Sequence, residues 1–281
     1  MGGGSPARRP IPAKLLAGIE AMGMRATEAF WTAIPPEVAR RVRPHVERVG
    51  DALITLCANS DALRLNRVIG LGHRGEASEA VIDGIIERYR RHRLRRFSIM
   101  LAPGPQSAEI AAWLAERGFA RHAGYALLVR DTRRPVAAPR TDLRVTKATR
   151  RDAESIVSIH EQCFAGPPSR RPWALAGTFL PGIEQYLAWA GRVPVGVGTL
   201  RIEGDLAWFG GGATLTPWRR HGAHAALIAV RLRRAARAGS RWAWVETAEP
   251  EPGRPAVSHR NLVRMGFEPA CIKSAFVWHA D

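Results

Sequence analysis

The chain has 281 residues, 46% of them hydrophobic and 24% charged, a composition that fits one large globular domain or two smaller ones. No apolar run approaches the roughly 20 residues of a membrane-spanning helix, so we expect no membrane segment. With 42 Lys and Arg against 25 Asp and Glu, the net charge of +17 favours anionic partners. A compositional bias is the rival explanation for the arginine content, and the richness in Ala, Arg, Gly and Pro fits it, so the charge selects no function.

The first twelve residues, "MGGGSPARRPIP", contain no apolar signal core, and we interpret 1–12 as a disordered tail. The tail begins Met-Gly, but Pro6 occupies the position where N-myristoylation requires Ser or Thr. Cys57, Cys163 and Cys271 are far apart and odd in number, which is typical of reduced thiols. These features predict a cytoplasmic location.

In the first half, "ASEAVIDGIIERYRRHR" places Val81, Ile85 and Tyr89 on one stripe and indicates an amphipathic helix. A strand "RFSIMLAP", a short helix "SAEIAAWLAERGF" and a strand "AGYALLVRD" follow. The preceding "GLGHRG" (70–75) has the glycine spacing of a dinucleotide site, but such a site needs an acidic residue at the end of the next strand. "RFSIMLAP" offers none, so we interpret these glycines as turn residues.

The polar stretch "DTRRPVAAPRTD" (131–142) has no apolar periodicity and indicates a linker. After it we predict a strand "LRVTKAT", a helix "RRDAESIVSIHEQCF", a hairpin formed by "IEQYLAWAGRV" and "PVGVGTLRIEGD", and a strand "LAWFGGGATL". A helix over 222–238, a strand "RWAWVETAEP", a helix "VSHRNLVRMGF" and a strand "ACIKSAFVW" complete the prediction.

The two halves end in the same way. "WLAERGF" and "NLVRMGF" are each a helix that ends at Gly-Phe and leads into a strand. Gly118 and Gly266 occupy the position of a left-handed helix cap, with the Phe returning to the core. We therefore predict two related α/β domains with mixed sheets, at 13–130 and 143–281, joined by the linker at 131–142.

The segment "TLTPWRRHGAHAALI" (214–228) connects a strand that ends near Leu215 to a helix that begins near Gly222. The first turn of a helix has free backbone N–H groups that bind anions, and Gly222 permits close approach to the backbone. Arg219 and Arg220 add charge-assisted donors that suit phosphate oxygens. The segment therefore predicts a diphosphate-binding loop.

This loop resembles the diphosphate motif of the GNAT family of acyl-CoA-dependent N-acyltransferases, Arg/Gln-x-x-Gly-x-Gly/Ala after the fourth strand. Arg219 and Gly222 occupy its first two fixed positions, whereas His224 replaces the small last residue. The element order from about 143 to 281 and "SHRNLVRMGF" resemble the family as well. The resemblance implies a tandem GNAT protein with a partial, degenerate N-terminal domain. It also implies a coenzyme A site formed by Gly212, Ala213, Thr214, Arg219, Arg220, His221, Gly222, Ala223, His224 and Asn261.

In such enzymes the fourth and fifth strands splay apart and the acyl-pantetheine arm pairs with strand four, here at 212–214. The resemblance implies that one backbone N–H there polarises the thioester carbonyl while the acceptor amine attacks directly, helped by a base and an acid. Many members carry an acidic Tyr where this chain has Leu262. Ser258 or a water is our substitute acid. Asn261, in the same helix, is either a coenzyme-binding residue or a polar surface residue.

Glu246 is our candidate for the general base. Strand alternation in "RWAWVETAEP" places it on one face with Trp242 and Trp244, where a cleft among tryptophans would raise its pKa. The alternative is that Glu246 pairs with one of the many arginines. We therefore predict Glu246 and Ser258 as catalytic residues, with Glu203 as second choice for the base.

The predicted function is transfer of an acetyl group from acetyl-CoA to an unidentified amine acceptor, by a monomer or homodimer. His221 and His224 form His-x-x-His, but no carboxylate or cysteine stands at ligand spacing, so we predict no metal site. A non-catalytic acyl-CoA sensor is an alternative, favoured by His224 and Leu262. A nucleic-acid-binding protein is favoured only by the charge, since no aromatic-and-basic binding motif supports it.

Overall fold

The computed structural model describes residues 11–75, 77–164, 171–253 and 256–280, so most of the predicted tail 1–12 lies outside the described residues. The helices and strands, in chain order, are α1 (Ala13–Thr32), α2 (Pro36–Val42), β1 (Pro44–Val49), β2 (Ala52–Cys57), β3 (Arg67–Ile69), α3 (Glu79–Arg91), β4 (Arg96–Leu101), α4 (Ser107–Glu116), β5 (Ala120–Asp131), β6 (Arg144–Lys147), α5 (Ala153–Cys163), α6 (Arg171–Thr178), β7 (Ile183–Ala190), β8 (Val193–Glu203), β9 (Leu206–Thr214), α7 (Ala223–Arg237), β10 (Trp242–Ala248), α8 (Val257–Arg264) and β11 (Glu268–His279).

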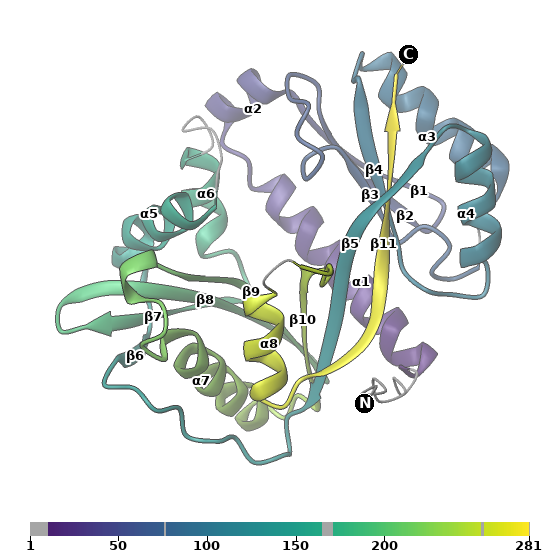
Figure 1. Cartoon of the computed structure of the whole chain (residues 1–281). Helices are drawn as coiled ribbons and strands as arrows, with labels where there is room; N and C mark the ends of the chain where they lie inside the picture. The colour runs from purple at the N-terminus through teal and green to yellow at the C-terminus, as the bar shows by residue number, and fades with distance from the viewer. Residues whose placement is uncertain (1–10, 76, 165–170, 254–255, 281) are drawn as a thin grey trace.

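The described strands form one mixed sheet in the order β1-β2-β3-β4-β11-β5-β10-β9-β8-β7-β6. The pairs β3–β4 and β9–β10 are parallel, and the hairpin predicted for the second half is the antiparallel pair β7–β8. Helices from both halves of the chain pack on this sheet (Figure 1). The predicted α/β class with a mixed sheet is confirmed.

Each half of the chain sends its last strand into the sheet of the other half. β5, from the first half, pairs antiparallel with β10, and β11, from the end of the chain, pairs antiparallel with β4. β5 and β11 also pair with each other, and Figure 1 shows them running side by side through the middle of the molecule. Backbone hydrogen bonds therefore join the two halves in one continuous sheet. The division at 131–142 stays a prediction.

The matched Gly-Phe endings have the predicted geometry. Gly118 and Gly266 are left-handed, with φ of +79° and +82°. The N–H of Phe119 donates to the Leu114 carbonyl, and the N–H of Phe267 to the Leu262 carbonyl, both at 3.0 Å. Both Phe side chains are buried. These two helix caps are confirmed, because the local chemistry of glycine fixes them without help from distant residues.

The helices of the second half cover both faces of its strands. On one face, α7 and α8 bury Leu227, Leu232 and Leu262 against β9 and β10. On the opposite face, α5 packs Ile156 and Ile159 against β7 and β8. The loop between β9 and α7 therefore lies at the C-terminal end of β9, close to the helices on both faces of the sheet.

α1, which the sequence did not predict, crosses the junction between the halves. Its Ile19 and Met22 pack against Trp244 of β10, and its Met24 packs against β2 and β3 of the first half. Trp244 lies on the strand face opposite to Val245, which faces α7. α1 therefore covers the same face of the sheet as α5.

The glycine-rich loop 70–75 of the first half is a turn, as predicted. Gly70, Gly72 and Gly75 all have positive φ. The N–H groups of Gly72 and Arg74 each donate to the buried Asp51 carboxylate at 3.1 Å. A carboxylate of the chain itself thus occupies the donors that a phosphate would need. Among the described helices, none is long and apolar enough to cross a bilayer.

Candidate functional site

A left-handed glycine shapes the loop between β9 and α7. Gly222 has φ of +81° and stands directly before α7. A methyl group on its Cα would lie 2.6 Å from the Arg140 carbonyl oxygen and 2.8 Å from Thr141 Cβ, so only glycine fits. Thr141 Oγ1 donates to the His221 carbonyl at 2.6 Å. The segment before β6, which contains Arg140 and Thr141, therefore packs against this loop and fixes its backbone.

The first turn of α7 presents unpaired donors. No side chain of the described residues caps the helix, and its first backbone bond runs from the Ala226 N–H to the Gly222 carbonyl at 3.0 Å. The N–H groups of the three residues between them are left for another acceptor. The first turn contains no acidic residue, and Arg219 and Arg220 are exposed beside it. This arrangement favours an anion.

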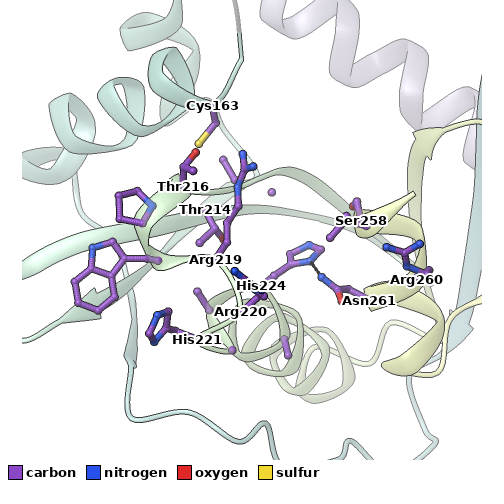
Figure 2. Close-up of a pocket in the computed structure, with 18 of the residues that line it drawn as sticks. Cys163, Thr214, Thr216, Arg219, Arg220, His221, His224, Ser258, Arg260 and Asn261 are labelled. Atoms are coloured by element: carbon purple, nitrogen blue, oxygen red, sulfur yellow. Dashed lines mark hydrogen bonds between the residues drawn. The ribbon is translucent and has the colours of Figure 1, made fainter. Parts of the chain in front are cut away.

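A cavity of about 1380 Å³ lies against this loop. Its wall comes from α5, β9, the loop, the first turn of α7 and α8 (Figure 2). The lining residues are Cys163, Phe164, Gly212, Ala213, Thr214, Thr216, Pro217, Trp218, Arg219, Arg220, His221, Gly222, Ala223, His224, Ala225, Val257, Ser258, Arg260, Asn261 and Arg264. The structure thus brings together every predicted site residue except Glu246 and the second-choice base Glu203, which forms ion pairs with Arg25 and Arg201 instead.

The strands beside the cavity separate. β9 pairs with β10 only as far as Trp208 and Trp244, and then continues to Thr214 without a β10 partner. The N–H of Leu215 donates to a β8 carbonyl at 2.9 Å, so by strand alternation the N–H groups of Thr214 and Gly212 point toward the gap. The splayed strands expected from the resemblance are confirmed.

A buried arginine supports the irregular part of β9. The register between β8 and β9 shifts opposite Gly211, which has φ of +55°. Arg231 of α7 donates to the carbonyls of Thr199 and Gly210 at 2.9 and 3.3 Å, and its guanidinium lies 4.8 Å from the centre of the Phe209 ring. Burial lowers the pKa of Arg231 to about 9. A positive charge therefore lies beneath the bulge in β9.

The sequence reasoning missed Arg231 and His160. Arg231 was detectable, because it stands four residues after Leu227 on the apolar side of α7, where a charged residue is unusual. His160 of α5 bonds through Nε2 to the Gly211 carbonyl at 2.8 Å. Burial lowers the pKa of His160, although this hydrogen bond opposes the effect. Both side chains hold the β9 backbone from opposite faces of the sheet.

Cys163, also missed as a site residue, lines the cavity at the end of α5. Burial raises the pKa of its thiol, although the charge of Arg219 and a hydrogen bond with the Thr214 backbone act in the opposite direction. Figure 2 shows Cys163 and Arg219 on the same side of the cavity, near Thr216.

His224 turns away from the loop between β9 and α7. Its ring points toward α8, where Asn261 Nδ2 lies 3.3 Å from His224 Nδ1 (Figure 2). Removal from water, together with the charge of Arg231, lowers the pKa of His224 to about 4, so the ring is neutral at physiological pH. The departure from the GNAT motif thus leaves the backbone of the first turn of α7 uncovered.

The helix α8 presents Ser258 but not a tyrosine. Ser258 is exposed on the cavity wall, as is the neighbouring Val257. Leu262 is buried, at 2% exposure, among the apolar side chains between α7 and β10. The position where many GNAT proteins carry an acidic tyrosine is therefore part of the core here.

Glu246 lies on the face of β10 that carries Trp244, as predicted, but its surroundings differ from the prediction. Its Oε1 lies 2.8 Å from the Nζ of Lys273 on β11, and the same ammonium lies 2.7 Å from Glu20 Oε1 on α1. Burial alone would raise the pKa of Glu246, but the charge and hydrogen bond of Lys273 outweigh it and lower that pKa. The expected raised pKa is wrong, because the exchanged strand β11 brings a lysine beside the carboxylate.

The two loop histidines do not converge on a shared ligand position. His221 packs its ring 5.6 Å from that of Trp218, while His224 faces α8. Across the described ranges, no group of three His, Cys, Asp or Glu side chains is arranged to hold a metal ion.

Comparisons with known proteins identify the fold. No protein-family model matches the chain, and no curated protein matches it. Among solved structures it is similar to a tandem GNAT protein from the clavulanic acid biosynthesis pathway, with a TM-score of 0.63 and 17% identity over 97% of this chain and 98% of that one.

Two GCN5-related N-acetyltransferases also match. The protein from Kribbella flavida has a TM-score of 0.58 and 18% identity over 90% and 93% of the two chains. The protein from Sphaerobacter thermophilus has a TM-score of 0.59 and 17% identity over 96% and 93%. The chain has the tandem GNAT fold.

Proposed function

We propose that this chain, with its tandem GNAT fold, is an acyl-CoA-dependent N-acetyltransferase whose active site lies in the second half. One observation carries the proposal. The uncapped first turn of α7 lies beside two exposed arginines, at the end of β9 that no longer pairs with β10. A diphosphate and an extended pantetheine arm need these two features side by side.

The residues present fit coenzyme A. The N–H groups at the start of α7 and the guanidinium groups of Arg219 and Arg220 would bind the diphosphate. The backbone of Gly212, Ala213 and Thr214 would pair with the pantetheine arm. Gly212 is exposed toward the gap, while a hydrogen bond connects the Thr214 backbone to Cys163. We therefore assign the carbonyl-polarising N–H to Gly212.

Acetyl-CoA supplies the acetyl group as an activated thioester, and the protein supplies position and charge. The Gly212 N–H would stabilise negative charge that develops on the thioester oxygen as the amine attacks. Arg231, whose guanidinium is bonded to the Gly210 carbonyl, fixes the backbone that carries this donor. Closing the gap around the arm would exclude water and strengthen the interaction.

Glu246 remains our candidate for the group that receives the amine proton. It lies on β10 beyond the point where β9 separates, and its side chain keeps 31% exposure. Because Lys273 lowers its pKa, Glu246 is ionised at neutral pH, so it would attract a protonated amine before accepting a proton. Ser258 remains the candidate acid from the protein, since it is the hydroxyl that α8 offers to the cavity.

A specific observation favours one alternative, a non-catalytic acyl-CoA-binding protein. Leu262 is buried at the position of the usual tyrosine, so α8 gives no strong acid for the leaving thiolate. A coupled thiol-release assay over a panel of amines separates the two functions. Release of coenzyme A above the rate of hydrolysis supports the enzyme, and tight binding without release supports the sensor.

The diphosphate assignment is tested by charge removal. We expect Arg219→Ala and Arg220→Ala each to weaken acetyl-CoA binding about 10- to 100-fold, because each removes charge-assisted hydrogen bonds to phosphate. Arg237→Ala, in the last turn of α7 and far from the loop, is the matched control and should bind acetyl-CoA normally. Isothermal titration calorimetry gives all three constants, and equal affinity for the loop variants and the control would contradict the assignment.

The acceptor is proposed only as an amine. We also propose a cytoplasmic location, because Cys57 and Cys163 are free thiols.

A further inference from the structure

The residue that departs from the GNAT motif, His224, is held in one orientation. The amide nitrogen of Asn261 lies 3.3 Å from its Nδ1. An amide nitrogen donates and does not accept, so Nδ1 is the acceptor and the ring proton resides on Nε2. Asn261 thereby selects the tautomer as well as the direction of the ring.

The Nε2 of His224 lies over Gly212, in the part of β9 that has no β10 partner. A methyl group placed on Gly212 would lie 3.4 Å from Nε2, so the ring nitrogen faces this glycine directly. No hydrogen bond joins Nε2 to another group among the described residues. A donor therefore lies over the sheet face at Gly212, the same residue whose backbone N–H points into the gap.

The ring keeps this donor at physiological pH. Removal from water lowers the pKa of His224, and so does the charge of Arg231 on the same face of α7. Both effects oppose binding of a second proton by the ring. The imidazole is consequently a neutral hydrogen-bond donor, a form in which a histidine polarises a substrate without giving up its proton.

We propose that His224 is a catalytic residue that donates a hydrogen bond from Nε2–H to the thioester sulfur, and that Asn261 is its positioning residue. The proposal rests on the acetyl-CoA site proposed above. In the step it assists, the amine nitrogen forms a bond to the acetyl carbon, the carbon–sulfur bond breaks, and its electron pair moves to sulfur. His224 keeps its proton and stabilises the resulting thiolate, while the amine proton leaves to Glu246 or to solvent.

This role accounts for two departures from the family pattern together. The tyrosine that would meet the thiolate from α8 is replaced by the buried Leu262. The small residue that ends the diphosphate motif is replaced by a histidine of α7 whose Nε2 lies over Gly212. The chain thus lacks one donor for the sulfur and holds another in its place.

The test measures the thiol pKa of bound coenzyme A, so it does not need the acceptor. Thiolate absorbance near 240 nm is followed against pH for loaded minus unloaded protein, in a Cys163→Ser background that removes the thiol of the cavity wall. We expect binding to the otherwise unchanged protein to lower the pKa of the coenzyme thiol by about one unit, because a hydrogen bond to a charged group has that magnitude.

Three variants divide the outcomes. His224→Ala should return the thiol pKa close to that of free coenzyme A and change acetyl-CoA affinity less than about threefold. His224→Gln, whose amide retains a donor near the Nε2 position, should keep part of the shift. Asn261→Ala should also lose part of it, and it tests the proposal even where His224→Ala does not fold.

An unchanged thiol pKa in folded His224→Ala, or tenfold tighter binding of acetyl-CoA by that variant, would overturn the proposal. Tighter binding would mean that the ring obstructs the arm. If the unsubstituted protein does not bind coenzyme A at all, the acetyl-CoA site itself is refuted and this proposal with it. Binding without any thiol shift refutes only the role of His224.

Discussion

Replacing Gly222 by alanine is the substitution that the loop geometry predicts most sharply. Alanine at a φ of +81° costs about 1–2 kcal/mol relative to glycine. The added methyl group would also lie 2.6 Å from the Arg140 carbonyl oxygen and 2.8 Å from Thr141 Cβ, and neither neighbour is the flexible end of a side chain. Overpacking of this kind adds about 1–3 kcal/mol, so the free energy of unfolding should fall by about 2–5 kcal/mol.

Gly191, in the turn between β7 and β8, is the matched control. Its φ is +59°, but a methyl group there meets nothing within 4 Å. Gly191→Ala therefore carries the backbone cost of about 1–2 kcal/mol without the clash. Because 1 kcal/mol corresponds to roughly 2–4 °C in a chain of this size class, the thermal midpoint of Gly222→Ala should lie roughly 2–12 °C below that of Gly191→Ala.

The two variants should also differ in binding. Displacing Gly222 moves the first N–H groups of α7, so acetyl-CoA affinity should fall at least tenfold, whereas Gly191→Ala should bind like the unsubstituted protein. Circular dichroism melting and calorimetry provide both values. Equal melting of the two variants would refute the predicted clash, and unimpaired binding by Gly222→Ala would refute the role of the loop.

Three further predictions concern ionisable side chains. Glu246→Gln should lower turnover about 100-fold or more and leave acetyl-CoA affinity within about twofold, because it removes the proton acceptor and not the diphosphate loop. Cys163 should react slowly with a maleimide, since burial raises its pKa, and coenzyme A should protect it. Cys57, buried with a pKa of about 12, should stay unlabelled in peptide mapping. Because the pKa of His224 falls from 6.5 to about 4 on folding, the unfolded chain binds this proton first. Stability should therefore fall by up to about 3 kcal/mol as the pH drops from about 6.5 to 4, and His224→Ala should flatten this part of the curve.

Each of these predictions has a contradicting result. Full turnover by Glu246→Gln would remove that carboxylate from the mechanism. Labelling of Cys163 at the same rate with and without saturating coenzyme A would locate the coenzyme away from the cavity. Urea unfolding curves with the same acid sensitivity for the unsubstituted protein and His224→Ala would show that folding does not lower the pKa of His224.

The local part of the fold was predictable because short-range chemistry determines it. The helix predicted over 222–238 corresponds to α7 (Ala223–Arg237), and the two Gly-Phe endings adopt the expected caps. The strand–loop–helix arrangement around Arg219 and Gly222 is also present as expected. In each case the residues that decide the geometry are neighbours in the sequence.

The exchange of β5 and β11 was not predictable by the same reasoning. Each strand has the apolar pattern of a buried strand, and that pattern does not say which partner strand it will meet. The error about Glu246 has this origin, because its pKa depends on Lys273, which the exchange brings beside it. Glu20 of α1 joins the same ion cluster from the other end of the chain.

The backbone of the candidate site was predicted from the sequence, but its side-chain arrangement was predicted only in part. The sequence motif identifies Arg219 and Gly222 from their residue types and spacing. The direction of the His224 ring, by contrast, depends on Asn261, which lies on another helix. Arg231 escaped the sequence reasoning because it stands within the apolar face of α7, although a charge at that position was itself the signal.

The central claim is that the loop between β9 and α7 binds the diphosphate of acetyl-CoA. Calorimetric titration of the full chain with acetyl-CoA tests it most directly, with Arg219→Ala beside it. We expect one site per chain, with a micromolar dissociation constant that weakens at least tenfold in the variant. Absence of binding at micromolar acetyl-CoA, or binding that Arg219→Ala leaves unchanged, would contradict it.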